Sequence, residues 1–224
     1  MDTADVICAL LCCMMSRLCA RGKSLKLLGR AFDLSAAYRQ LCVSEASQDC
    51  AWVGVYNPVQ GRAQAFMQVA LPFGARAAVN GFIRSARFLQ WLALKCLTIL
   101  NSCYFDDFAT FSVPLLASNT DECMSMLLDL LGWAFDREGP KADQFGPSLS
   151  VLGVEIDLER SDEGTIFVAN TAKRRDELVH RLDDVLLAGT LSRQAALELR
   201  GRLAFAESQI MGLAGQRGLK EVLG

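Results

Sequence analysis

Three pairs of short runs rich in strand-forming residues, each pair joined by a turn signal, constrain the fold of this chain most strongly. The pairs are residues 51–56 and 64–70 around Asn-Pro-Val-Gln-Gly, residues 98–105 and 108–113 meeting at Asp106-Asp107, and residues 150–158 and 165–168 around Ser-Asp-Glu-Gly. Runs separated by turn signals of this kind pair as antiparallel hairpins. The sequence therefore predicts a sheet built largely from antiparallel hairpins.

Helical patterns fill the spaces between these hairpins and the end of the chain. They are predicted at residues 4–20, 75–94, 120–133, 171–188 and 192–211, with Asn119 or Thr120 as the cap of the third helix and Ser192 as the cap of the last. A buried strand at residues 31–34 runs into a helical turn through residues 36–38. This order is typical of an α+β domain, with an antiparallel sheet packed on helices and a helical segment after it.

Composition places the chain among ordinary globular proteins. It has 224 residues, of which 52% are apolar and 21% are charged, and these values exclude a disordered or fibrous protein. The 23 basic and 25 acidic residues give a net charge of −2, whereas nucleic-acid-binding proteins usually carry an excess of positive charge. Any assignment to nucleic acid therefore has to come from a site.

The nine cysteines and the single histidine, His180, do not have the spacing of a zinc site. The odd number of cysteines also fits a disulfide framework poorly, so we expect reduced, mostly buried thiols in an intracellular protein. Asp2 and Asp5 stand where a signal peptide would carry Lys or Arg, and the apolar run 6–15 is too short to span a bilayer. The sequence therefore predicts a soluble chain with no membrane partner.

Adjacent carboxylates in an aromatic run are the first chemical signal. Asp106 and Asp107 are flanked by Cys, Tyr and Phe residues, and two like charges about 4 Å apart repel by about 4 kcal/mol at an effective dielectric constant of about 20. A divalent cation with oxygen ligands offsets this repulsion. Asp33 ends an apolar strand; if that strand neighbours the hairpin, the three acids converge where two Mg²⁺ ions could bind about 4 Å apart.

The three acids can also be explained by local structure, without a metal ion. Asp is a favoured turn residue, so the Asp106-Asp107 pair is also explained as turn chemistry. Asp33 is also explained as a helix N-cap, with Ser35 as a rival for that role.

Three segments together resemble the reverse transcriptase family. Tyr-Phe-Asp-Asp (104–107) resembles its YxDD box, Phe-Asp-Leu-Ser-Ala-Ala-Tyr (32–38) resembles its first acidic motif, and Leu-Pro-Phe-Gly (71–74) looks like the motif between them. The motifs occur in the family's order, and Asp106 follows Asp33 by 73 positions, a spacing typical of that family's palm. Leu-Gly-Trp (131–133) with Lys141, and then Leu-Gly-Val (152–154), are similar to the fourth and fifth motifs. The resemblance covers residues 31–158 and is closest to the retrotransposon type.

The resemblance implies a fold and an activity. Residues 31–170 would form a polymerase palm, residues 171–224 a helical thumb or connection segment, and residues 1–30 an N-terminal helix with a basic lead-in. The activity would be RNA-directed DNA polymerase activity: nucleotidyl transfer from dNTPs to a primer 3′-hydroxyl on an RNA or DNA template. Two Mg²⁺ ions, replaceable by Mn²⁺, would be the cofactors, and the rest of a retroelement polyprotein would be a partner.

The resemblance also implies residue roles. Asp33 and Asp106 would be the principal metal ligands and Asp107 a weaker third, and Lys141 resembles a lysine proposed to protonate pyrophosphate. Tyr38 matches the aromatic residue beneath the incoming sugar, Phe73 and Gly74 approach nucleotide and template, Phe105 lies next to the primer terminus, and Arg76 meets phosphate or template backbone. A core role for Tyr38, a solvated loop for Lys141 and a solvated helix start for Arg76 are the alternatives.

Departures from the family pattern keep a second function open. Val79 stands where the family often has Pro, and 32 residues precede Asp33, whereas the family usually has a longer, basic fingers region there. The basic stretch of Arg21, Lys23, Lys26 and Arg30 is either a remnant of the fingers or an unrelated lead-in. The alternative function is a catalytically inactive or truncated remnant that acts as a binding module. A nucleotide cyclase is disfavoured, since its turn would read Gly-Gly-acid-acid-Phe.

Overall fold

The computed structural model describes residues 3–137 and 144–223. Its helices are α1 (Ala4–Ala20), α2 (Arg76–Cys96), α3 (Ala117–Leu130), α4 (Ala172–Ala188) and α5 (Arg193–Leu223). Its strands are β1 (Leu28–Asp33), β2 (Trp52–Asn57), β3 (Arg62–Met67), β4 (Leu100–Tyr104), β5 (Asp107–Ser112), β6 (Ser148–Val151), β7 (Val154–Asp157) and β8 (Phe167–Asn170). Short 3-10 helices are η1 (Ala37–Gln40), η2 (Glu45–Cys50), η3 (Pro114–Leu116) and η4 (Ser161–Glu163). The fold is mixed α+β with antiparallel sheets, as the sequence predicted.

The central sheet has the order β1-β5-β4, with β5 in the middle. β4 and β5 form a hairpin, and β1 pairs antiparallel with β5 from Leu28 opposite Ser112 to Asp33 opposite Asp107. Successive side chains of a strand point to opposite faces. On β5, Phe108 therefore points to one face of the sheet and belongs to the core on that face. Ala109 and Phe111 point to the opposite face and belong to a second core, which includes residues of α1.

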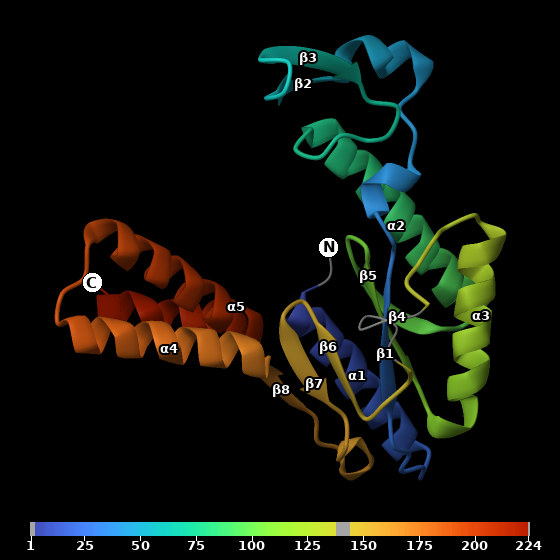
Figure 1. The fold of residues 1–224 in the computed structure, drawn as a ribbon. Helices are drawn as coiled ribbons and strands as arrows, with labels where there is room; N and C mark the ends of the chain where they lie inside the picture. The colour runs from blue at the N-terminus through green and yellow to red at the C-terminus, as the bar shows by residue number, and fades with distance from the viewer. Residues whose placement is uncertain (1–2, 138–143, 224) are drawn as a thin grey trace.

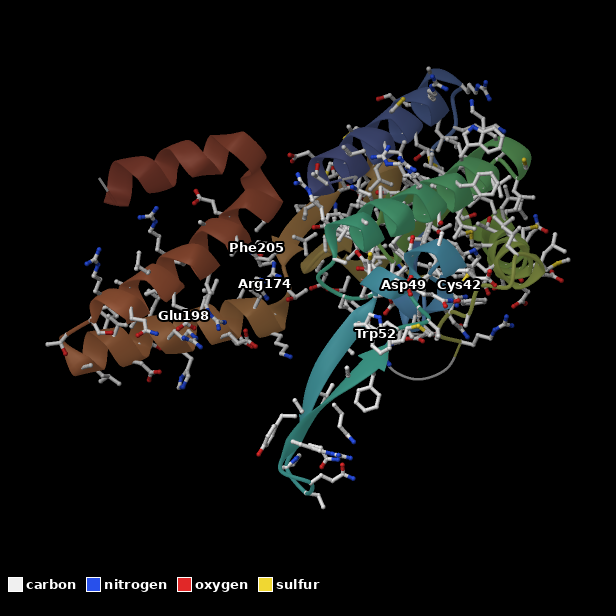
Figure 2. The ribbon with its side chains drawn as sticks, turned by 90° about the horizontal axis from the view of Figure 1, so that it is seen from above. Cys42, Asp49, Trp52, Arg174, Glu198 and Phe205 are labelled. Carbon is white, nitrogen blue, oxygen red and sulfur yellow. The ribbon has the colours of Figure 1, made fainter. Side chains whose placement is uncertain are left out.

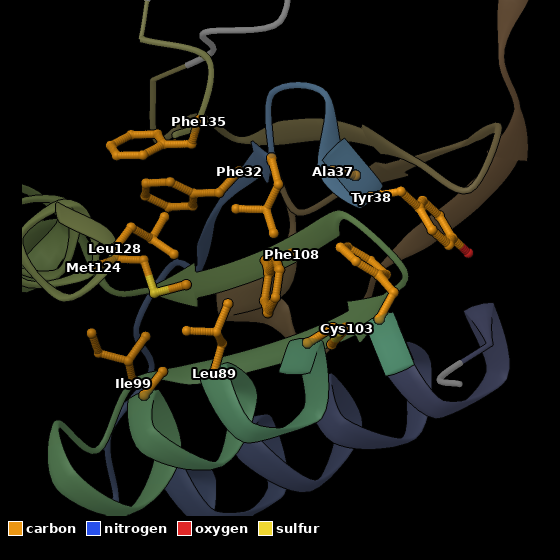
Figure 3. Packing of buried hydrophobic residues seen from close by; sticks show 14 of the residues in the cluster. Phe32, Ala37, Tyr38, Leu89, Ile99, Cys103, Phe108, Met124, Leu128 and Phe135 are labelled. Atoms are coloured by element: carbon orange, nitrogen blue, oxygen red, sulfur yellow. The ribbon is translucent and has the colours of Figure 1, made fainter. Parts of the chain in front are cut away.

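Helices α2 and α3 cover one face of this sheet. Figure 3 shows the packing of Phe32 and Phe108 from the sheet with Leu89 of α2 and with Met124 and Leu128 of α3. The buried residues of α2 are Ala78, Phe82, Ala86, Leu89 and Ala93, a three- and four-residue spacing that places them on one face of a helix. Full burial of a Phe or Leu side chain stabilises by about 1.5–3 kcal/mol, so this core fixes the position of β1 relative to α2.

The opposite face is covered by α1 and by the second sheet, β6-β7-β8. Ile7 and Leu11 of α1 are fully buried in a core that also contains Phe111 of β5 and Val154 and Ile156 of β7. The prediction of a helix at residues 4–20 is confirmed. The helix packs against the same sheet whose first strand ends at Asp33.

Two parts of the chain project from this body. In Figure 1 the β2–β3 hairpin extends from one end and the α4–α5 pair from one side, and Figure 2 shows the same arrangement from above, with Trp52 on the hairpin and Arg174 and Phe205 labelled between α4 and α5. The Arg174 guanidinium lies over the Phe205 ring, 4.8 Å from its centre. No described helix is long and apolar enough to cross a membrane.

Several local predictions are wrong in instructive ways. Helix α3 begins at Ala117, so neither Asn119 nor Thr120 caps it; the Thr120 hydroxyl is instead hydrogen-bonded with that of Ser112 at 2.9 Å. Residues 150–158 do not form one strand, because a turn at Leu152 and Gly153, both with positive φ, divides them into β6 and β7. The cap at Ser192 is confirmed by a 3.2 Å bond from the Ala195 amide to its hydroxyl, but α5 extends to Leu223.

The cysteines also differ from expectation. All nine lie in the described part of the chain and none of them forms a disulfide there. Cys103 is buried, Cys8 and Cys123 are partly exposed, and the remaining six are exposed. The prediction that most thiols are buried is therefore wrong. On α1 the buried face is formed by Ala4, Ile7 and Leu11 rather than by its four cysteines, and Cys42, Cys50 and Cys96 are exposed outside this helix.

Candidate active site

The end of β1 and the tip of the β4–β5 hairpin meet in direct backbone contact. Asp33 lies opposite Asp107 in the strand register, and the Leu34 amide donates a 3.2 Å hydrogen bond to the Asp106 carbonyl. The strand adjacency on which the convergence of the acids depended is therefore confirmed. Asp33 and Asp106, which lie 73 positions apart in the sequence, are thus at the same end of the paired strands.

The hairpin turn separates the roles of the two adjacent acids. Tyr104 pairs with Asp107, which leaves Phe105 and Asp106 as a two-residue loop. Phe105 has φ 54°; a positive φ at the first loop position is what a type II′ turn requires, and such a turn usually has glycine there. Turn chemistry can therefore account for Asp106, but Asp107 is already the first residue of β5.

The capping explanation of Asp33 does not hold. The residue that precedes η1 is Ala36, with φ 55°, and no side chain caps that short helix. The Ser35 hydroxyl is hydrogen-bonded to the Asp136 carboxylate instead. Neither Asp33 nor Ser35 caps a helix, so helix capping does not explain why an acid stands at the end of β1.

All three acids are partly exposed. Asp33 and Asp107 are directly opposite in an antiparallel pair, so their Cβ atoms lie on one face of the sheet, about 4.5–5.5 Å apart. Their neighbours Phe32 and Phe108 point to the other face and are buried against α2 and α3. The sheet thus presents two opposed carboxylates on one face, with a third at the adjoining turn.

Tyr38 joins the core to this group of acids. Its side chain is almost fully buried, and its ring stacks on that of Phe82 with the ring centres 4.7 Å apart. Burial, and then the negative charge of Asp106, raise the pKa of the Tyr38 phenol. The alternative given for Tyr38, a core role, is confirmed for its ring. The influence of Asp106 places the same side chain within electrostatic reach of the hairpin.

The segment before α2 contributes an exposed aromatic side chain to the same region. The Phe73 ring lies 4.9 Å from that of Tyr38 and is 72% exposed, so it has a face open to solvent. Gly74 has φ 86°, and a Cβ there would meet nothing within 4 Å; its backbone conformation, rather than close packing, is what calls for glycine. Arg76 is exposed at the first turn of α2.

The remaining predicted residues are placed less centrally. Phe105 packs edge-on against Tyr104, with ring centres 5.1 Å apart, and is partly buried against the core of α2 and α3. Leu152 and Gly153 form the β6–β7 turn, and the Arg174 side chain occupies the space where a Cβ of Gly153 would stand. Lys141 lies outside the described residues.

Two of the four basic residues at positions 21–30, Lys26 and Arg30, form ion pairs within the fold. Lys26 donates a 2.6 Å hydrogen bond to the Glu159 carboxylate. Arg30 is buried, forms an ion pair with Asp121 of α3 and lies over the Phe32 ring, 4.2 Å from its centre. Arg30 also lines a cavity of about 570 Å³ beside α3, to which Asp33, Asp106 and Asp107 do not contribute. Arg30 is therefore committed to holding α3 against β1, whereas Arg21 and Lys23 are exposed.

The sequence did not predict that residues 134–136 and Gln40 contact the residues that follow Asp33. The Asp136 amide donates a 3.0 Å hydrogen bond to the Asp33 carbonyl, and the side chain of Gln40 contacts Ser35 and Ala134. These contacts join parts of the chain about 100 positions apart. No local pattern in the sequence marks them.

The three carboxylates fit a metal ion that is bound partly by substrate phosphates better than one that is bound by protein side chains alone. Within residues 3–137 and 144–223, no three or more Asp, Glu, His or Cys side chains are grouped closely enough to hold a metal ion by themselves. Mg²⁺ in nucleotide enzymes, however, is usually bound by one or two carboxylates together with substrate phosphates and water. Carboxylates at the end of β1 and the start of β5 suit an ion that arrives with a triphosphate.

Comparison with known proteins gives no assignment. No family model matches the chain, and no curated protein matches it.

Proposed function

We propose that this chain is the polymerase palm of a reverse transcriptase of the retroelement type, with a helical thumb-like segment after residue 170. It would extend a primer on an RNA or DNA template by adding dNTPs. The observation that carries this proposal is the strand register in which Asp33 lies opposite Asp107, beside the hairpin turn that holds Asp106. Two of the three segments that carry the family resemblance contain these acids.

Asp33, Asp106 and Asp107 are the residues that would hold Mg²⁺. Bound with the triphosphate, the metal supplies neutralising charge and a lowered pKa of the primer 3′-hydroxyl. The chain's own contribution would be positional, because the β1–β5 pairing and the Leu34–Asp106 hydrogen bond join the backbone segments that carry the three acids. A group already held in place needs little reorganisation during the reaction.

Tyr38 and Phe73 are the residues that would meet the sugar of the incoming nucleotide. Their rings are in contact, Phe73 is largely exposed, and Tyr38 is backed by Phe82. A ring held on both sides cannot move away from an added hydroxyl group, so this pair would exclude the 2′-hydroxyl of a ribonucleotide. The charge of Asp106 acts on the Tyr38 phenol, which supports placing the two rings and Asp106 around one nucleotide.

The proposal is tested by the binding of Mn²⁺ with a dNTP, measured by electron paramagnetic resonance. The wild-type chain should bind the pair, and Asp106→Asn should weaken binding at least about tenfold, because partners even one step removed from a metal change affinity 10- to 100-fold. Asp49→Asn changes an exposed acid on η2, labelled in Figure 2 near Cys42, and should leave the affinity unchanged.

Chemistry is tested in the same preparations. Wild-type protein, incubated for long times at high concentration with a short primer–template, should add a first nucleotide, and Asp33→Asn and Asp106→Asn should not. Equal Mn²⁺–dNTP affinity in the wild type, Asp106→Asn and Asp49→Asn would overturn the metal site. A wild type that neither binds the pair nor extends the primer would instead support the inactive remnant.

A further inference from the structure

The carboxamide of Gln40 bridges two backbone segments that meet beside Asp33. Gln40 is the last residue of η1, and its Nε2 donates hydrogen bonds to the carbonyls of Ser35 and Ala134, at 2.6 and 2.8 Å. The amide of Ala134 donates in return to Oε1 of Gln40, at 2.7 Å. One side chain thus makes three hydrogen bonds with the main chain, and two of them join segments 94 positions apart.

The pattern of donors and acceptors is specific to glutamine. Both protons of the amide nitrogen are directed at carbonyl oxygens, and the amide oxygen accepts from an N–H group. A glutamate carboxylate has no proton to donate, and asparagine is one methylene shorter. A methionine of similar length could fill the space but would leave three polar backbone groups without this partner.

These bonds hold the turn at residues 35–36 that follows β1. The Ser35 amide donates to the Ala134 carbonyl and the Asp136 amide donates to the Asp33 carbonyl, each at 3.0 Å. Between Ser35 and η1, Ala36 adopts φ 55°; for a residue with a side chain, such a conformation is unfavourable and persists only when its surroundings hold it in place. The three bonds of Gln40 are part of those surroundings.

We propose that Gln40 is a positioning residue for the acids at the end of β1. It does not touch the metal or the nucleotide; it holds residues 33–36 against residues 134–136 and thereby sets the direction of the Asp33 carboxylate toward Asp107. The inference rests on the proposed function, since it concerns the acids that would hold the metal. Loss of the bridge loosens the Asp33 turn while the cores on either face of the sheet stay packed.

The first measurement is amide hydrogen exchange, which needs no activity. In Gln40→Met, the amides of Ser35, Ala134 and Asp136 should exchange about tenfold faster than in the wild type, whereas amides in β5 should be unchanged. Gln194→Met, at an exposed glutamine in the first turn of α5, is the matched control and should change none of them.

The second measurement is the Mn²⁺–dNTP affinity, which a merely structural role would leave unmoved. Gln40→Met should weaken it about three- to tenfold, and raising the metal concentration should restore binding. Gln40→Glu should be weaker still near pH 7, because its carboxylate faces two carbonyl oxygens. Its melting temperature should approach that of the wild type as the pH falls below about 5, because the protonated carboxyl can again donate.

The outcomes separate this inference from the proposed function. If the wild type does not bind the Mn²⁺–dNTP pair, the proposed function fails and this inference falls with it, although faster exchange would still establish the bridge. If the wild type binds the pair, faster exchange in Gln40→Met with unchanged affinity would overturn the positioning role. Unchanged exchange at Ser35 and Ala134 would overturn the bridge itself.

Discussion

Tyr38 illustrates at the scale of one residue how the core and the candidate site share a side chain. Its ring is buried against Phe82, yet Asp106 is close enough to affect its ionisation. The sequence suggested both a core role and a place beneath the sugar. In this fold the two are compatible, because a ring that is to exclude a hydroxyl group has to be immobile.

Replacement of Tyr38 should therefore separate stability from selectivity. Tyr38→Ala should lower the free energy of unfolding by about 3–5 kcal/mol, as large-to-small changes of buried aromatic residues do, and should raise the use of a ribonucleotide relative to its deoxyribonucleotide. Tyr38→Phe keeps the ring and should leave that ratio unchanged. The measurement is single-nucleotide extension with each substrate. If Tyr38→Ala leaves the ratio unchanged, Tyr38 is a core residue and nothing more.

The ionisation of Tyr38 depends on the same two neighbours, the core and Asp106. Burial first, and the Asp106 charge second, raise its pKa, so the fold favours the neutral phenol. The corresponding contribution to stability is fully present below the ordinary tyrosine pKa of about 10 and is lost as the pH rises through the raised value of the folded state. Asp106→Asn should lower the pKa of Tyr38 without returning it to the ordinary range, because burial remains.

Nuclear magnetic resonance of the Tyr38 ring carbons during an alkaline titration measures this shift. Asp49→Asn should leave the titration midpoint of Tyr38 in place. A midpoint unmoved by Asp106→Asn would mean that the Asp106 carboxylate does not lie within electrostatic reach of the phenol, and the shared site would lose its main electrostatic support.

Local patterns found some residues of the candidate site and could not find others. Asp33 and Asp106 stand out because a charged side chain in an apolar strand or an aromatic hairpin is energetically unfavourable. The few residues on either side of each acid are enough to recognise this. Gln40 and Asp136 stand out in no such way. Their partners lie about 100 positions away, and the contacts exist only once β1 and residues 134–136 are adjacent.

At the scale of elements, turn chemistry explains most of what the sequence predicted. The β2–β3 and β4–β5 hairpins formed where turn residues separate strand-like runs. The β6–β7 hairpin was missed, because its turn begins with Leu152 at φ 56°, and leucine is not a turn signal. A positive φ at such a residue is imposed by the strands on either side rather than by local preference.

An ion pair between Arg30 and Asp121 links β1 to α3. Arg30 belongs to the basic stretch that was considered a remnant of the fingers or an unrelated lead-in, and its side chain is buried and paired with Asp121. Removing one partner of a buried pair costs about 3–5 kcal/mol, and the partial exposure of Asp121 reduces this. We therefore expect Arg30→Ala to lower the free energy of unfolding by about 2–3 kcal/mol, less than the full cost of a buried pair.

Urea unfolding followed by circular dichroism measures this change. Arg21→Ala, at an exposed position of the same basic stretch, should stay within about 0.5 kcal/mol of the wild type, as surface substitutions usually do. Equal stability of the two variants would mean that Arg30 does not hold α3 against β1.

For the whole molecule, charge limits how the chain can hold nucleic acid. The net charge is −2, and several cations already have acidic partners within the fold: Lys26, Arg30, Arg137, Arg160, Arg181 and Arg202. Cations held in such pairs contribute less to phosphate binding. A palm with this charge balance would hold its primer–template mainly by shape and by a few phosphate contacts.

The salt dependence of primer–template binding tests this limit. Affinity falls with salt at a slope of about −0.9 per phosphate contact in a plot of log affinity against log salt concentration, so a few contacts predict weak binding with a slope shallower than about −3. Arg76, exposed at the start of α2 next to Phe73 and Gly74, is the cation best placed to supply one of them. Arg76→Ala should reduce the steepness by about one unit, whereas Arg17→Ala, at an exposed position of α1, should not. A steep slope in the wild type would reveal a phosphate-binding surface elsewhere on the molecule, and an unchanged slope in Arg76→Ala would make Arg76 a solvated helix start.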